Sequence, residues 1–192
     1  MNAFLEALLM STGLVALAEI GDKTQLLAFM LAARFRRATP IIAGILIATI
    51  ANHAFAAALG TWLTQALGPQ PLRWLLGLSF IAMAIWVMIP DRLDDDDIGM
   101  PRLGVLGTTV VAFFLAEMGD KTQVATVALA AQHELFVAVV AGTTAGMMIA
   151  NVPAVLAGDR IADRLPVRLV HAVAAVLFAL LGVATLSGFD PF

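Results

Sequence analysis

Long apolar runs alternate with short polar segments along the whole chain. A hydrocarbon core ~30 Å thick is crossed by about 20 apolar residues in a helix. By that measure the pattern predicts six membrane-spanning helices, over residues 4–33, 40–66, 72–90, 103–132, 135–158 and 166–188. The first run is not interpreted as a signal peptide, because its start lacks a basic segment and carries Glu6.

The composition agrees with a membrane protein. Of the 192 residues, 61% are hydrophobic and only 13% are charged, well below the quarter that is typical of soluble domains. The net charge of −3 and the lack of a basic patch argue against nucleic-acid binding, and the absence of cysteine excludes disulfides and thiolate metal ligands. The chain is therefore expected to be an all-α integral membrane protein with a single domain over residues 1–192.

One polar string occurs twice inside the apolar runs. Residues 17–25 read LAEIGDKTQ and residues 115–123 read LAEMGDKTQ, an offset of 98 residues. Weaker matches follow nearly the same offset, such as Phe80 with Phe178. The chain is therefore interpreted as two three-helix repeats, about 1–90 and about 103–192, joined by an acidic linker at about 91–102. Because three is an odd number of spans, the second repeat enters the membrane from the opposite side. The second repeat is therefore inverted relative to the first, as in many secondary transporters.

The arginines in the predicted loops indicate the orientation, since Lys and Arg gather on the cytoplasmic side of membrane proteins. One side of the predicted bundle has only Arg73. The other side has eight arginines, Arg34, Arg36, Arg37, Arg92, Arg102, Arg160, Arg164 and Arg168. Both termini are therefore expected outside the cytoplasm and the linker inside. The acidic run Asp94–Asp97 is interpreted as a solvated linker, with a cation-attracting patch as the alternative.

Each repeated string places charged side chains near the middle of its predicted span. If each span is one continuous helix, its two acids and its lysine share a face; these are Glu19, Asp22 and Lys23, then Glu117, Asp120 and Lys121. A charge at mid-membrane costs at least ~2.5–3.5 kcal/mol, so these groups must face one another or a wet cavity. Inverted symmetry would bring the two strings together at the midplane.

The charges of the two strings do not cancel. Four carboxylates and two lysines leave −2, which one divalent cation or two protons would neutralise. Carboxylate oxygens suit Mn²⁺, Ca²⁺ and Mg²⁺, and close carboxylates exchange protons readily. We therefore expect a transported divalent cation, with no permanently bound cofactor, at the four acids Glu19, Asp22, Glu117 and Asp120.

Other polar or flexible residues could complete or support this site; they are Gly21, Lys23, Thr24, Gln25, Asn52, Gly119, Lys121, Thr122, Gln123 and Asn151. The glycines either break the helix and free carbonyls or allow close helix packing. The Thr, Gln and Asn side chains are ligands or hydrogen bonds between helices, and the lysines are expected to pair with the acids when the cation is absent. His171, near a span end, is interpreted as interfacial.

Two copies of E-x-G-D-K-T, one in each three-helix half, resemble the Gdt family, the Golgi calcium/manganese transporters and their bacterial manganese-exporting relatives. The motif maps onto residues 19–24 and 117–122 without departure. The resemblance implies a transporter that exports a divalent cation, Mn²⁺ first and Ca²⁺ second, in exchange for protons, with the motif acids as ligands. The short chain looks like a bacterial member, which implies the inner membrane; the partners are then the metal ion and the lipid bilayer, with a homo-oligomer left open.

Three other functions are weighed against a transporter without enzymatic activity. An intramembrane aspartyl protease also uses two membrane aspartates, but its Gly-x-Gly-Asp pattern does not account for Glu19 and Glu117 or for the lysines. An exporter of an organic cation or a basic amino acid would need a larger cavity with apolar and aromatic lining. A passive channel fits inverted repeats with mid-membrane acids less well than alternating access does.

Overall fold

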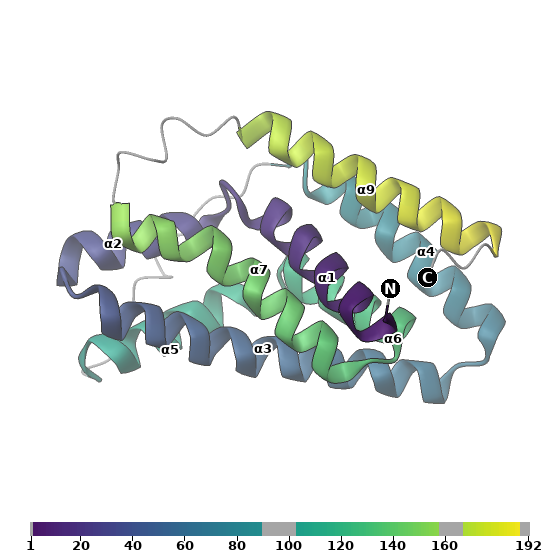
Figure 1. The fold of residues 1–192 in the computed structure, drawn as a ribbon, viewed down its shortest axis with the longest axis horizontal. Helices are drawn as coiled ribbons and strands as arrows, with labels where there is room; N and C mark the ends of the chain where they lie inside the picture. Colours follow the sequence, from purple (N-terminus) through teal and green to yellow (C-terminus); the bar gives the residue numbers. More distant parts are fainter. Residues whose placement is uncertain (1, 90–102, 158–166, 189–192) are drawn as a thin grey trace.

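The computed structural model describes residues 2–89, 103–157 and 167–188, and within these ranges the regular elements are α-helices (Figure 1). They are α1 (Ala3–Glu19), α2 (Lys23–Phe35), α3 (Ala38–Ala66), α4 (Pro69–Trp86), α5 (Gly104–Glu117), α6 (Lys121–His133), α7 (Phe136–Ala157) and α9 (Val167–Ser187). The predicted linker, residues 91–102 with its acidic run, lies outside the described residues.

Within the described part of the chain, three helices are long and apolar enough to cross a membrane alone, namely α3, α7 and α9. The pair α1 and α2 provides a fourth crossing if the two helices, bent by 71° at a short break, are taken as one broken span. The described part of the chain is thus an all-helical membrane protein with three or four candidate spans by length and composition. The other predicted spans coincide with α4 and with the short pair α5 and α6.

The prediction of one continuous helix across each motif is wrong. α1 ends at Glu19 and α2 begins at Lys23, and the equivalent break separates α5 from α6. Gly21 and Gly119 have φ angles of 85° and 78°, a left-handed conformation that costs other L-residues about 1–2 kcal/mol. A glycine in this conformation ends the helix, so the motif acids and lysines do not share one helical face.

The two breaks have the same backbone conformation. Ile20 and Met118, which precede the glycines, have φ and ψ of −63° and 116°, and of −65° and 118°. Asp22 and Asp120, which follow the glycines, both have φ of −81° and ψ of 169°. The sequence repeat is therefore also a repeat of local structure, in which each aspartate is the N-cap residue of a new helix.

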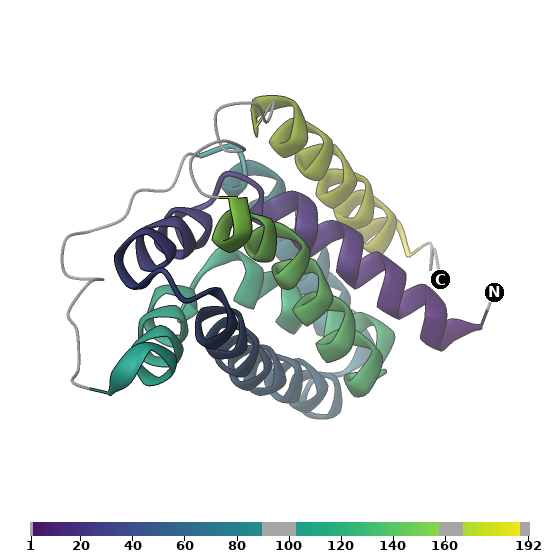
Figure 2. The same ribbon diagram turned by 60° about the vertical axis from the view of Figure 1, so that its left-hand side comes forward.

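The helices pack in a way that buries the acids of both motifs inside the protein. α7 packs on α1, α3 packs on α5, α6 and α7, and α4 packs on α9, as Figures 1 and 2 show. α4 and α9 run antiparallel, since Arg73 near the start of α4 lies against Gly188 just after α9. Between them the repeat-related Phe80 and Phe178 stack with ring centroids 6.4 Å apart, and both are fully buried.

Close helix contacts depend on glycines outside the motifs. A Cβ added at Gly142 of α7 would lie 2.5 Å from the Leu8 carbonyl oxygen of α1, and one at Gly44 of α3 would lie 2.7 Å from Cβ of Thr109 in α5. Small residues allow helix backbones to approach in this way where the surrounding solvent is lipid. The resulting contacts fix α1 and α5, and therefore the break at the end of each.

Candidate functional site

The acids of both motifs are buried where the helices break. Glu19 and Glu117 have no exposed surface, Asp22 is 1% exposed and Asp120 is 3% exposed. Isolated charges at such positions would be very unfavourable, so partners are required. The partners found in the structure come from the motifs themselves.

Each motif lysine makes an ion pair with the aspartate of the other motif. Lys121 Nζ is 2.5 Å from Asp22 Oδ1, and both side chains are fully buried. Lys23 Nζ is 3.3 Å from Asp120 Oδ2, with 21% of the lysine side chain exposed. The structure therefore brings the two strings together, and the crossed pairs join the two halves of the chain. Local charge is compensated at the aspartates but not at the glutamates.

Each motif glutamate is held by a threonine of its own motif. Thr24 donates to Glu19 Oε2 at 2.6 Å, and Thr122 donates to Glu117 Oε2 at 2.9 Å. Among the described residues, the other oxygen of each glutamate, Oε1, is buried and accepts no hydrogen bond. These two glutamate oxygens are therefore available to a cation or a proton, since buried polar atoms normally have a hydrogen-bond partner.

The motif glutamines shape the breaks. Gln25 accepts a hydrogen bond from the Gly21 N–H at 2.9 Å, and Gln123 accepts one from the Gly119 N–H at 2.7 Å. The amide of Gln25 also donates to the Ala150 carbonyl of α7 at 3.0 Å. Each glutamine therefore accepts a hydrogen bond from a backbone N–H that has no partner within the helix. Both glutamines thus stabilise the left-handed backbone at the motif glycine.

The two repeat-related asparagines lie beside the motifs but are bonded differently. Asn52 donates to the Phe114 carbonyl at 3.0 Å and accepts from Gln123 at 3.4 Å. Asn151 donates to the carbonyl and the sulfur of Met147, at 3.1 and 2.9 Å. Within the described residues its Oδ1 is buried without a hydrogen-bond partner. Asn52 thus bridges helices, whereas Asn151 keeps an oxygen that is available to a ligand.

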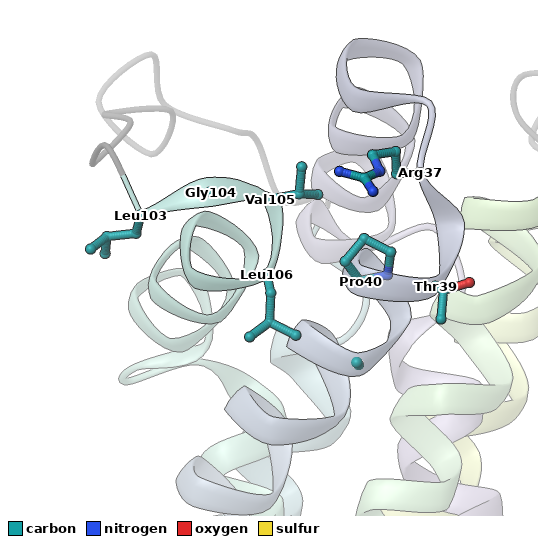
Figure 3. Close-up of a pocket in the computed structure, with 8 residues that line it drawn as sticks. Arg37, Thr39, Pro40, Leu103, Gly104, Val105 and Leu106 are labelled. Carbon is teal, nitrogen blue, oxygen red and sulfur yellow. The ribbon is translucent and has the colours of Figure 1, made fainter.

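The described residues contain no set of three or more His, Asp or Glu side chains already arranged to hold a metal ion. Of the four acids, the two aspartates are paired with lysines and the two glutamates are held by threonines. A surface hollow of about 460 Å³ lies elsewhere, between the first turns of α3 and α5 (Figure 3), and none of its lining residues belongs to a motif. Those residues are Arg37, Thr39, Pro40, Ala43, Leu103, Gly104, Val105 and Leu106.

The sequence interpretation missed one residue at the site. His171 of α9 was expected at the membrane interface, but its side chain is 8% exposed and its Nε2 lies 2.7 Å from the carbonyl oxygen of Ile20, in the first break. Val167, one turn earlier, lies over Gly21, where an added Cβ would be 2.3 Å from Val167 Cγ1. The motif copies contain no signal for these contacts, since α9 is distant in the sequence.

The motif glycines provide a matched pair for a stability test. Gly21→Ala and Gly119→Ala should each cost about 1–2 kcal/mol for the left-handed conformation. Gly21→Ala should cost a further ~1–3 kcal/mol for overpacking against Val167, whereas a Cβ at Gly119 meets none of the described residues within 4 Å. Thermal unfolding in detergent should rank the wild type above Gly119→Ala and Gly119→Ala above Gly21→Ala. Equal midpoints for the two variants would contradict the packing of α9 on the first break.

Fold and site together define a helical membrane protein whose buried acids meet lysines at two helix breaks, the arrangement of secondary cation transporters. Comparison with known proteins agrees. The profile of the family described as "Divalent cation/proton antiporter GDT1" matches residues 7–95 and 105–189. The chain therefore belongs to the GDT1 family, which is a family of transporters.

The chain is also similar to individual members of that family. A Vibrio cholerae protein named "Putative manganese exporter" is 50% identical over 94% of this chain and 90% of its own length. GDT1-like protein sll0615 of Synechocystis is 29% identical over 90% of this chain and 92% of its own. GDT1-like protein 3 of Arabidopsis thaliana is 27% identical over 97% of this chain and 71% of its own. No solved structure matches the chain.

Proposed function

We propose that this protein exports Mn²⁺ across the bacterial inner membrane in exchange for protons, with Ca²⁺ as the second candidate cargo. The observation that carries the proposal is the pair of buried glutamates, each with one oxygen held by a threonine and the other without a hydrogen-bond partner in the described residues. Membership of a cation/proton antiporter family supports it, and so does the similarity to a protein named as a manganese exporter.

The proposed site consists of Glu19, Asp22, Glu117 and Asp120, with the cation held first by the two glutamates. Their Oε1 atoms are hard oxygen ligands of the kind that Mn²⁺ and Ca²⁺ accept. The aspartates, paired with lysines across the two motifs, become ligands if the lysines withdraw. In this proposal the lysines act as internal counter-ions that hold the empty site together.

The remaining motif residues have supporting roles in this proposal. The glycines create the breaks, the threonines orient the glutamates, and the glutamines cap the glycine N–H groups. Asn151 Oδ1 is an additional candidate ligand, whereas Asn52 is bound to Phe114 and Gln123 and serves to link helices.

We also propose that the chain forms one domain of six spans, arranged as two inverted three-helix repeats. The two matched segments of the family profile coincide closely with the proposed repeats. The matching conformation of the two breaks supports the repeat, and the antiparallel arrangement of α4 and α9, which are equivalent in the two halves, supports inversion. The clustering of arginines supports termini outside the cytoplasm.

The orientation can be tested with single cysteines, because the chain has none of its own. In intact cells a membrane-impermeant maleimide should label Asn2→Cys but not Thr39→Cys, which lies at the start of α3 beside Arg37 (Figure 3). Both positions are exposed in the structure, so permeabilised cells should label both. Labelling of position 39 in intact cells, with position 2 protected, would reverse the proposed orientation.

The cargo can be identified by flux into proteoliposomes. Uptake of Mn²⁺, Ca²⁺ and Mg²⁺ should be compared at equal concentrations, each with an imposed pH gradient, and each unlabelled cation should be tested as a competitor. We expect Mn²⁺ to be transported fastest and Ca²⁺ to compete with it, while Mg²⁺ competes weakly, because it loses its bound water reluctantly. Transport of an organic cation without any divalent-cation flux would contradict the proposed cargo.

A further inference from the structure

The two motifs differ only at Ile20 and Met118 and their breaks have the same backbone conformation, but the surroundings of the breaks differ. At the first break α9 lies so close that a Cβ on Gly21 would be 2.3 Å from Val167. At the second break a Cβ on Gly119 would meet no atom of the described residues within 4 Å, and the neighbouring Met118 is 54% exposed. The position of α9, which lies outside both motifs, therefore distinguishes the first break from the second.

The helix packing shows the same asymmetry. In the described residues α9 packs against α1, and α4 packs against α6. If the third helix of each repeat occupied equivalent places, α4 would pack against α5 and α9 against α2. Neither of these pairs is among the helix pairs with substantial contact in the described residues. The start of α9 therefore covers the first break, and among the described helices no equivalent one covers the second.

His171 makes the polar contact between α9 and the first break. Its Nε2 lies 2.7 Å from the Ile20 carbonyl oxygen, and because a carbonyl only accepts, this nitrogen must carry the hydrogen. The Ile20 carbonyl follows the end of α1, where carbonyls lose their partners within the helix. With the offset of 98 residues, the equivalent position in the first repeat is Arg73, which contacts Gly188 instead.

We propose that His171 is a positioning residue that binds the Ile20 carbonyl, keeps the first break covered by α9, and withholds this oxygen from the cation. When His171 releases it, the carbonyl becomes an additional oxygen ligand for the cation beside Glu19. This role rests on the proposed cation transport, but the contact between α9 and the break does not. The two parts can therefore be tested separately.

The first test measures the cover itself by cysteine labelling of the full chain in nanodiscs. Ile20→Cys reports on the first break, and Met118→Cys is its matched reference in the second. His171→Met removes the N–H donor at similar length, and His171→Gln keeps one. His171→Met should raise the maleimide labelling rate of Ile20→Cys about three- to tenfold, the range expected for loss of one hydrogen bond. His171→Gln should stay within about twofold of the parent, and Met118→Cys should not respond.

Leu169→Ala is the control on α9, because this side chain is 64% exposed and should leave both labelling rates unchanged. Equal labelling of Ile20→Cys in the Met and Gln variants would overturn the proposal, as would an equal rise with Leu169→Ala. If His171→Met fails to fold while His171→Gln folds, the N–H donor is required to dock α9, which supports the proposal.

The second test measures Mn²⁺ transport with the same His171 variants in an otherwise native chain. If His171 controls access to the Ile20 oxygen, His171→Met should change KM for Mn²⁺ about three- to tenfold, and His171→Gln should restore the parental value. A fall in the maximal rate with unchanged KM in both variants would overturn the positioning role. The expected labelling rates in the first test, together with no Mn²⁺ flux in the parent protein, would overturn the proposed function. The contact between α9 and the first break would then still be established.

Discussion

Replacement of either buried glutamate, Glu19→Gln or Glu117→Gln, is expected to abolish Mn²⁺ export without unfolding the protein. The amide keeps an oxygen that can accept from the motif threonine. It removes the negative charge and the exchangeable proton, and a neutral side chain is less costly in the membrane than a carboxylate. Loss of a residue that only hydrogen-bonds a metal ligand already lowers metal affinity or activity about 10–100-fold. Loss of a direct ligand should therefore lower the Mn²⁺ flux by more than ~100-fold.

The matching control is Glu6→Gln, at the start of the same helix as Glu19 and only partly buried. This variant should transport at the parental rate. Flux of Mn²⁺ into proteoliposomes gives the activity, and thermal unfolding in detergent gives the stability. A glutamate variant that transports at more than about a tenth of the parental rate, with a normal unfolding midpoint, would exclude that residue from the site.

The aspartates are expected to behave differently from the glutamates. Asp22→Asn would leave Lys121 with an uncompensated charge, although both side chains are now fully buried as a pair. Breaking a buried pair in this way typically costs about 3–5 kcal/mol. Loss of transport in Asp22→Asn would therefore combine loss of a ligand with loss of stability. The glutamate variants separate the two effects, which is why they are the more informative experiment.

Much of the site could be predicted from the repeated string alone. Six charged groups inside apolar segments cannot face lipid, and two strings that differ at only one position suggest one shared, symmetric cluster. This reasoning predicted that lysines pair with acids and that both motifs meet. It also left open a helix break at Gly21 and Gly119, and the structure contains this break at both positions.

The errors arise where a local pattern depends on contacts that are distant in the sequence. Spacing within one helix suggested that Asp22 and Lys23 share a face with Glu19, but the left-handed glycine ends the helix between them. Each lysine then reaches the aspartate of the other copy, a choice that no spacing within one copy can indicate. The contact of His171 with Ile20 is likewise created by the packing of α9.

Export of one Mn²⁺ is expected to be coupled to the entry of about two protons and to be electroneutral, because the crossed pairs leave about two uncompensated charges. Each aspartate is already balanced by a lysine, so the charge that must be neutralised lies on Glu19 and Glu117. One divalent cation balances both glutamates, and so do two protons. An empty site with both glutamates ionised would be costly to carry across the membrane, so the return step should require protons.

This coupling can be measured in proteoliposomes that contain a pH indicator, with the membrane potential clamped at several values. Acidifying the side from which protons enter should accelerate Mn²⁺ export, whereas acidifying the side where Mn²⁺ binds should slow it, because protons compete for the same oxygens. Mn²⁺ flux without proton movement would exclude exchange. Proton-coupled flux that depends strongly on the membrane potential would agree with exchange of Mn²⁺ for protons but contradict electroneutral transport. That result would indicate that Lys23 or Lys121 is neutral in one of the transported states. Of the two, Lys23 is the one to replace first, because it is partly exposed and its pair is longer.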